Sequence, residues 1–216
     1  VRRKRPKRST ESGVNGINEK FFDLKKEKQD RIINAALAVF AAGGYEHAST
    51  DDIVRKAGIS KGLLFHYFIS KLGLYTFLYD YSVKYVTLEI KSSVTAEKQH
   101  YFALRKLMAF AKMQVMKNYP DMLLFIDTAS RERDPEAASA AASAKLRYEE
   151  GIERLYEQSD RTVFADQKVY MNVDRMLTYT ELGLAREHFE DGSLQPEMLF
   201  TEINGMIEQM RRLVAG

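Results

Sequence analysis

The chain has 216 residues, of which 45% are apolar, and its formal net charge is +3. That length suits one or two domains with a core of their own. The absence of cysteine excludes a disulfide framework, a thiolate metal site and a cysteine nucleophile, and it suits a reducing, cytoplasmic compartment. No apolar run reaches the roughly 18 residues of a spanning helix, so we expect no membrane association.

The positive charge is concentrated at the front of the chain. Residues 1–72 hold 15 Lys and Arg against 8 Asp and Glu, whereas the remainder holds 18 against 22. Six of the basic residues lie in "VRRKRPKR", which a stretch rich in Ser, Gly and Asn follows. We therefore expect residues 1–24 to form a disordered basic arm. A basic front indicates contact with a polyanion, and a solvated tail without a role is the alternative.

Helical patterns begin near Lys25 and continue to the end of the chain. Ile33, Leu37 and Phe40 recur at helical spacing up to a stop at the Gly43–Gly44 pair. Ser49 or Thr50 then caps a short second helix. Later helices are predicted over residues 71–93, 97–118, 134–159, 166–191 and 197–214. A further helix is predicted to begin at residue 120. No alternating run of strand length appears, so the predicted fold class is all-α.

The segment "GISKGLLFHYFISK", residues 58–71, has the features of a helix-turn-helix. Gly58 stops the second helix and Ser60 caps a third only two residues later. Apolar residues around this turn would pack both helices on the first and leave one face of the third free for a DNA major groove. A helical hairpin inside an all-α core, with Phe65 and Tyr67 buried, is the alternative from spacing alone.

Residues 31–75 resemble the DNA-binding domain of the TetR family of bacterial transcriptional regulators. The marks are Phe40-Ala41 with Gly44-Tyr45, then "AGISKG" at 57–62, then Phe65, Tyr67, Phe68 and Lys71. The resemblance implies an N-terminal three-helix domain over residues 25–71, followed by a larger helical domain for effector binding and dimerisation over residues 72–216. This second part matches the family only in length and in being helical.

The resemblance also implies roles in DNA binding for nine residues. Phosphates are expected near Thr50, Ser60 and Lys61 at helix N-termini, and near Tyr67 and Lys71 as clamps. Groove contacts are expected from Leu63, Phe65 and His66, with Gly62 allowing close approach to the backbone. The family often has Tyr where this chain has Phe65, and His where it has Tyr67. Any base contact by Phe65 is therefore apolar, for example with a thymine methyl group.

The second part of the chain suggests a ligand cavity and a dimer interface. All nine methionines lie at or after Met108, and Met and aromatic side chains build adaptable apolar pockets. The expected lining residues are Phe102, Phe110, Met113, Phe125, Tyr148 and Tyr170, with ordinary core packing as the alternative. The expected dimer seams are Val173, Leu177, Thr180 and Leu184, and Leu199, Ile203, Met206, Met210 and Leu213. Packing within one chain would use the same periodicity.

The function expected from these features is a homodimeric repressor that binds a palindromic operator in double-stranded DNA and is released by a small apolar or amphipathic effector. An activator of the same fold, or a non-specific helical protein that binds DNA or lipid, are the alternatives. We expect that the protein is not an enzyme and that it binds no cofactor or metal. The four histidines lack the spacing of metal ligands, and the sequence has no motif of a catalytic nucleophile or of a phosphate-binding loop.

Overall fold

The computed structural model of the chain describes residues 17–94, 99–190 and 192–215. Within these ranges the secondary structure is helical. A short 3₁₀ helix, η1 (Glu19–Phe21), precedes the α-helices α1 (Lys26–His47), α2 (Thr50–Ala57), α3 (Lys61–Phe68), α4 (Lys71–Ser93), α5 (Tyr101–Asn118), α6 (Met122–Ser130), α7 (Pro135–Gln158), α8 (Gln167–Glu190) and α9 (Pro196–Ala215). The predicted all-α fold is confirmed.

Local chemistry determines where several helices begin. The side chains of Ser60 and Ser70 accept hydrogen bonds from the backbone N–H groups of Leu63 and Gly73, and so cap α3 and α4. The carboxylate of Asp134 caps α7, whose first residue is a proline. Gly44 interrupts α1 near its end with a φ of 62°, which glycine adopts without steric cost.

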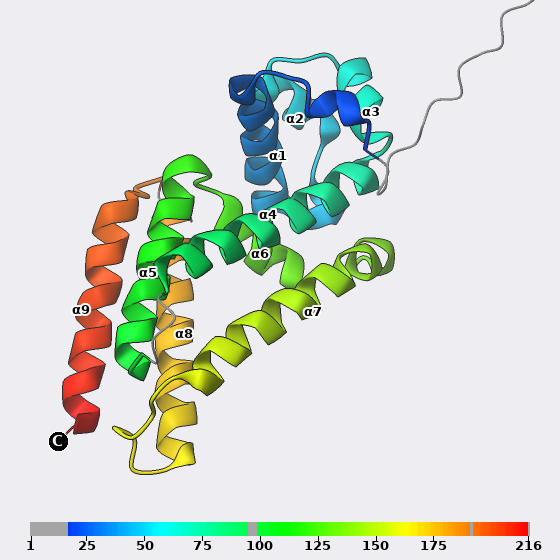
Figure 1. Cartoon of the computed structure of the whole chain (residues 1–216). Coiled ribbons are helices and arrows are strands. Elements are labelled where there is room, and N and C mark those ends of the chain that lie inside the picture. Colours follow the sequence, from blue (N-terminus) through cyan, green and yellow to red (C-terminus); the bar gives the residue numbers. More distant parts are fainter. Residues whose placement is uncertain (1–16, 95–98, 191, 216) are drawn as a thin grey trace, which may run out of the picture.

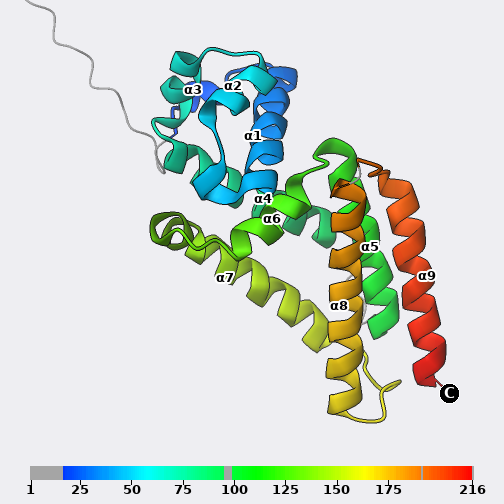
Figure 2. The same cartoon turned by 180° about the vertical axis from the view of Figure 1, so that it is seen from behind.

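The helices form a small N-terminal unit and a larger bundle (Figure 1). Helices α1, α2 and α3 lie together at one end of the molecule, and α4 leads from them into the bundle. In the bundle, α5 packs against both α4 and α9, while α7 runs obliquely across α4. Seen from behind, α8 and α9 lie side by side on the face of the bundle far from α3 (Figure 2).

One part of the predicted disordered arm is folded. Residues 17–24 include η1, and Phe21 is completely buried among the rings of Tyr67, Phe68 and Phe77. The backbone N–H of Asn18 donates to the carbonyl of Tyr67 at 2.8 Å. The expectation of disorder is therefore corrected for residues 17–24, because an aromatic side chain anchors them on α3. Residues 1–16 lie outside the described residues.

Candidate nucleic-acid interface and effector cavities

Helices α2 and α3 form a helix-turn-helix around Gly58. This glycine has a left-handed conformation, with a φ of 63°, and the next N–H, that of Ile59, bonds the carbonyl of Val54 at 3.1 Å. Ile53 and Leu64 are buried, so apolar contacts hold the two short helices on the N-terminal core. Each helix has only eight residues and depends on this packing for its stability.

The outward face of α3 carries most of the predicted DNA contacts. Lys61, Gly62 and His66 are exposed, and Leu63 and Phe65 are half-buried beside them. Among the described residues, no atom outside the neighbouring turn of α3 lies within 4 Å of the position that a Cβ on Gly62 would occupy. The Lys61 ammonium is 2.9 Å from the Asp51 carboxylate at the start of α2. This outward face of α3 therefore presents to solvent a cation, a glycine without a side chain, and an imidazole.

Ser49 and Ser60 cap the two short helices, and each was among the cap residues expected from the sequence. Ser49, and not Thr50, caps α2 by accepting from the N–H groups of Asp51 and Asp52. Thr50 is the first helical residue and is half-buried. Ser60 is exposed, and its hydroxyl already accepts from the N–H of Leu63.

The predicted phosphate clamps both have contacts inside the protein. Tyr67 is buried, with its ring 5.6 Å from that of Phe21, so the structure corrects its expected place on the surface. The reason is that η1 covers it. Lys71 is half-buried, with its ammonium 4.6 Å from the centre of the Tyr45 ring and 3.3 Å from the Glu46 carbonyl. Lys71 thus ties the start of α4 to the end of α1.

Asn18 belongs to this surface and was missed from the sequence. Its amide nitrogen lies 3.4 Å from His66 Nε2 and also 3.4 Å from the His66 carbonyl. Asn18 also caps η1 by accepting from the N–H of Lys20. The signal was present as an Asn cap before "EKFF", but the surrounding Gly and Asn residues favoured a disordered segment.

The positive charge of the front half lies mainly outside the described residues. Residues 1–16 hold six basic residues and one acidic residue, whereas residues 17–72 hold nine against seven. The folded DNA-binding unit is therefore only weakly basic. Long-range attraction to a polyanion depends largely on the first residues of the chain.

The larger bundle has several cavities, one of which, of about 720 Å³, lies between α4 and α7. Of two others, which share lining residues, the first, of about 300 Å³, has a largely apolar wall from α4, α5, α6, α7, α8 and α9 that includes Tyr79, Ile126 and Ile203. The second, of about 570 Å³, lies between α5, α7 and α8 and has more polar and charged walls. Both cavities share four residues, which are Lys112, Tyr148, Glu149 and Thr178.

Only two of the six expected lining residues face these cavities. Tyr148 lines both and Tyr170 lines the second. Phe102, Met113 and Phe125 are buried in the core, and Phe110 packs at the surface on Phe200, with ring centres 5.8 Å apart. Helix α5 is apolar on several sides, so its composition does not show which side faces a cavity. The placement of these four residues is therefore corrected.

A buried polar network, which was not anticipated from the sequence, forms part of the cavity walls. Arg105, only 3% exposed, donates to the Tyr156 hydroxyl at 2.8 Å and to the Thr178 hydroxyl at 2.9 Å. Lys112 donates to the Glu181 carboxylate at 2.8 Å, and that carboxylate also lies 3.7 Å from Arg105. Charged residues on α5 and α8 therefore meet inside the bundle.

The network stays charged at neutral pH. Burial would lower the pKa of Lys112, but the Glu181 carboxylate, together with Tyr156 and Tyr148, outweighs burial and raises this pKa. Burial alone would raise the pKa of Glu181, but Lys112 and Arg105 together lower it. Burial raises the pKa of the Tyr148 phenol, which therefore remains a hydrogen-bond donor.

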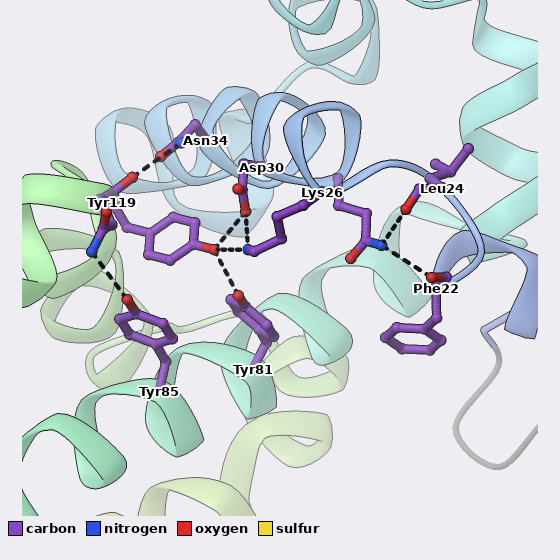
Figure 3. A network of polar contacts seen from close by, with 10 residues as sticks. Phe22, Leu24, Lys26, Asp30, Asn34, Tyr81, Tyr85 and Tyr119 are labelled. Carbon is purple, nitrogen blue, oxygen red and sulfur yellow. Dashed lines mark hydrogen bonds and ion pairs between the residues drawn. The ribbon is translucent and has the colours of Figure 1, made fainter. Parts of the chain in front are cut away.

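A second polar network joins the N-terminal unit to the bundle (Figure 3). The Tyr119 hydroxyl, just after α5, donates to Asp30 of α1 at 2.6 Å and accepts from Lys26 of α1 at 2.9 Å. It also lies 2.7 Å from the Tyr81 hydroxyl of α4. Nearby, the Asn34 amide donates to the Asn118 carbonyl at 3.3 Å. Three helices therefore meet through hydrogen bonds at this point.

Helix α6 also connects the first cavity with α1. Residues of α6, including Leu123 and Ile126, line that cavity. On its other side, Thr128 donates to the Ala41 carbonyl of α1 at 3.1 Å. Directly after α6, the Glu132 carboxylate accepts from the Tyr45 N–H at 2.7 Å. Any displacement of α6 by a ligand would therefore act on the end of α1.

The predicted dimer seams are taken up partly by packing within the chain. Val173, Leu177, Leu199 and Ile203 are buried in the single chain, so their assignment to the dimer interface is corrected. These four residues do repeat with helical spacing, but they pack against the core of the same molecule and not against a second copy. Thr180, Leu184, Met206 and Met210 are half-buried at the border of this core, and Leu213 is 78% exposed.

A face of α8 and α9 that shares Leu213 with the predicted seam carries large exposed apolar side chains. They are those of Met176, Tyr179, Met198 and Leu213, which are between 55% and 78% exposed. Gly183 on α8 and Gly205 on α9 are also exposed, and within the described residues no atom outside the glycine's own stretch of helix lies within 4 Å of the position that a Cβ would occupy on either. Large apolar side chains interleaved with glycine permit close approach of another helix.

No helix within the described ranges is both long and apolar enough to cross a membrane.

Comparisons with known proteins place the similarity mainly in the first part of the chain. Residues 32–76 match the family described as bacterial regulatory proteins, tetR family. The uncharacterized HTH-type transcriptional regulator TtgW of Pseudomonas putida is 37% identical over 75 residues, which are 35% of this chain and 44% of TtgW. The HTH-type transcriptional regulator SrpR of the same species is 36% identical over 75 residues, 35% of this chain and 28% of SrpR. The chain thus spans less than half the length of these curated relatives.

Similarity of fold extends over nearly the whole chain. A TetR family transcriptional regulator from Chloroflexus aurantiacus, known from its crystal structure, superposes with a TM-score of 0.58 at 20% identity. The match covers 92% of this chain and 96% of the other. At this identity the match is evidence of a shared fold alone.

Proposed function

We propose that this chain, whose residues 32–76 match the tetR family of bacterial regulatory proteins, is a cytoplasmic, homodimeric transcriptional repressor of that family. It binds a palindromic operator in double-stranded DNA, and a small apolar or amphipathic effector releases it. The observation that carries this proposal is the exposed face of α3, with Lys61, Gly62 and His66 turned outward on a helix-turn-helix.

Palindromic recognition requires two copies of α3 at a fixed separation. Two-fold symmetric dimers of this kind place their recognition helices about one DNA turn apart, roughly 34 Å. The exposed apolar face of α8 and α9 supplies a surface on which two copies associate, and a four-helix arrangement would bury Met176, Tyr179, Met198 and Leu213. Helices α8 and α9 lie on the bundle, away from α3 (Figure 2), so association through them would leave both α3 helices free.

Effector control follows from the contacts of α5 and α6. A ligand in the first cavity touches α6, which holds the end of α1, and also α5, whose C-terminal end holds the start of α1 through Tyr119 and Asp30. Displacing these helices would rotate the N-terminal units relative to each other. The two α3 helices would then no longer match successive major grooves, and operator affinity would fall.

Selection of bound fragments from a random DNA pool tests this proposal. We expect enrichment of one inverted repeat, with half-sites about one helical turn apart. The variant His66→Ala should enrich an altered repeat, since few side chains on so short a helix reach the bases. Recovery of fragments without a common sequence would instead identify a non-specific DNA-binding protein. A reporter gene behind the selected operator then separates repression from activation.

A further inference from the structure

The junction between the two cavities is lined by polar side chains. Lys112 and Tyr148 line both cavities, and Thr178 lies on the same shared wall. On one side of the junction is the apolar first cavity, and on the other is the larger, charged second cavity. A ligand that reaches the junction therefore meets an apolar wall at one end and polar side chains at the other.

The junction offers more hydrogen-bond donors than the described part of the protein uses. The Lys112 ammonium has three N–H groups, and one of them is bonded to Glu181. The Lys112 side chain keeps 27% of its surface accessible, and it lines both cavities. Among the described residues, no hydrogen bond is made by the Tyr148 hydroxyl, which remains protonated near Lys112. A bound molecule with strong acceptor atoms would satisfy these donors.

Four charged side chains lie around the junction and differ in exposure, with Lys112 at 27% and Asp174 at 31%. Arg105 and Lys112 face a single deeply buried carboxylate, that of Glu181, whose side chain is 10% exposed. Asp174 lies 3.9 Å from Arg105, and it accepts from the Tyr101 hydroxyl. Buried charges act at short range with little screening, so Arg105 and the pair of Lys112 and Glu181 act most strongly on a group at the junction.

Three further carboxylates line the second cavity and are exposed to solvent, and one of them, Glu149, also lines the first cavity and therefore stands at the junction itself. Glu149, Glu153 and Glu157 lie at four-residue spacing on α7, and all three are exposed. Water and salt screen them, so their effect on a group bonded to Lys112 is weaker than that of Lys112 itself. They would nevertheless favour a cationic ligand, so an amine must be among the probes.

We infer that the effector is an amphipathic monocarboxylic acid, whose carboxylate binds Lys112 and Tyr148 at the junction and whose apolar body fills the first cavity. The inference rests on the proposed function and specifies its ligand. Charge-assisted hydrogen bonds from ammonium and phenol to a carboxylate are among the strongest that a protein makes. The walls of the first cavity, with Tyr79, Leu123, Ile126 and Ile203, suit an aliphatic chain or ring system.

The test compares ligands that differ only in their head group. Dodecanoic acid, dodecanamide, dodecanol and dodecylamine are titrated into the full chain by calorimetry at pH 7, below their micelle-forming concentrations. We expect the acid to bind roughly tenfold or more tightly than the amide and the alcohol, as a charge-assisted hydrogen bond requires. The same ranking is expected for release of the selected operator.

Variants at the junction show whether Lys112 causes this ranking. Lys112→Met keeps an unbranched side chain that is one atom shorter and removes the charge. The double variant Lys112→Met with Glu181→Gln removes the whole ion pair without leaving a buried carboxylate unpaired. In both, the acid should lose its advantage over the amide while the amide keeps its affinity. Lys106→Met is the matched control, because Lys106 lies on the same helix and pairs with Glu208 at 2.8 Å, outside both cavities.

Each outcome decides the inference. If the amine binds most tightly, or if all four ligands bind equally, the effector is not recognised by a carboxylate, although the bundle still has an effector cavity. An acid preference that persists in the double variant would overturn the role of Lys112. If no probe binds although the protein selects an operator, both the inference and effector control by amphipathic molecules fail, while DNA binding stands.

Discussion

The hydroxyl of Tyr119 donates to the carboxylate of Asp30 at 2.6 Å, across 89 residues of sequence. Asp30 belongs to the first helix of the DNA-binding unit, and Tyr119 follows the central helix of the bundle (Figure 3). Tyr119 is itself buried, and its hydroxyl is shared with Lys26 and Tyr81. This contact therefore links the N-terminal unit to the bundle through one hydroxyl that a Tyr-to-Phe substitution removes.

Removing that hydroxyl should weaken communication between the N-terminal unit and the bundle. In Tyr119→Phe we expect a loss of about 1 kcal/mol in the free energy of unfolding, the usual value of a hydrogen bond, and a smaller effect of the effector on operator affinity. Tyr85→Phe is the control, because the Tyr85 hydroxyl bonds Asn118 at 3.2 Å within the bundle. The measurement is operator affinity with and without effector. Equal effector responses in both variants and the wild type would exclude a coupling role for Tyr119.

Charges on the exposed face of α8 and α9 should separate the dimer without unfolding the chain. The double variant Tyr179→Glu with Leu213→Glu places two carboxylates where large exposed apolar side chains now lie. Light scattering should show a monomer with an unchanged helical circular dichroism spectrum. Leu88→Glu, at a similarly exposed leucine on α4, should remain a dimer. If the double variant is a stable dimer, association uses another surface.

Lys61 and His66 should contribute to DNA binding in different ways. Lys61→Ala should weaken binding to all sequences alike and lower the slope of log affinity against log salt by about 1. His66→Ala should change the preferred sequence and leave that slope nearly constant. Lys84→Ala, on α4 and paired with Asp80, is the control. A sequence-dependent loss in Lys61→Ala would contradict its assignment to phosphate.

The Glu181 carboxylate should stabilise the bundle in a pH-dependent way. Its pKa in the folded protein is lowered by Lys112 and Arg105, so its contribution is fully present above the unfolded-state pKa of about 4.3 and is lost as the pH falls through the lower folded-state pKa. Glu181→Gln should cost about 1 to 3 kcal/mol at pH 7, less than a fully buried pair, because Lys112 faces a cavity. Urea denaturation should show the two proteins converging below about pH 4. A difference that stays constant far into the acid range would mean that Glu181 is not the titrating group.

The helices and the helix-turn-helix could be predicted from the sequence because their signals are local. Ser60, Ser70 and Asp134 cap the helices that directly follow them, and Gly58 adopts the left-handed conformation that its turn needs. The resemblance of residues 31–75 to one family added the outward face of α3. These features can be predicted without knowing which distant residues are in contact in the folded chain.

The features that could not be predicted all depend on distant partners. Tyr67 is buried because Phe21, 46 positions earlier, folds over it. Leu199 and Ile203 repeat with helical spacing, but the spacing does not distinguish the chain's own core from a second copy. Lys112 and Glu181 are separated by 69 residues, so nothing in either local segment indicates an ion pair beside a cavity.

The central claim is that ligand in the bundle changes the separation of two DNA-binding units. The chain contains no cysteine, so Ala42→Cys, at an exposed position of α1, gives one spin label per protomer. The distance between the two spin labels is measured by pulsed electron paramagnetic resonance, first on the protein bound to its operator and then after effector is added. The account predicts one narrow distance on the operator and a distribution displaced by several ångströms when effector is added. The same narrow distance in both states, while effector still releases the operator, would contradict it.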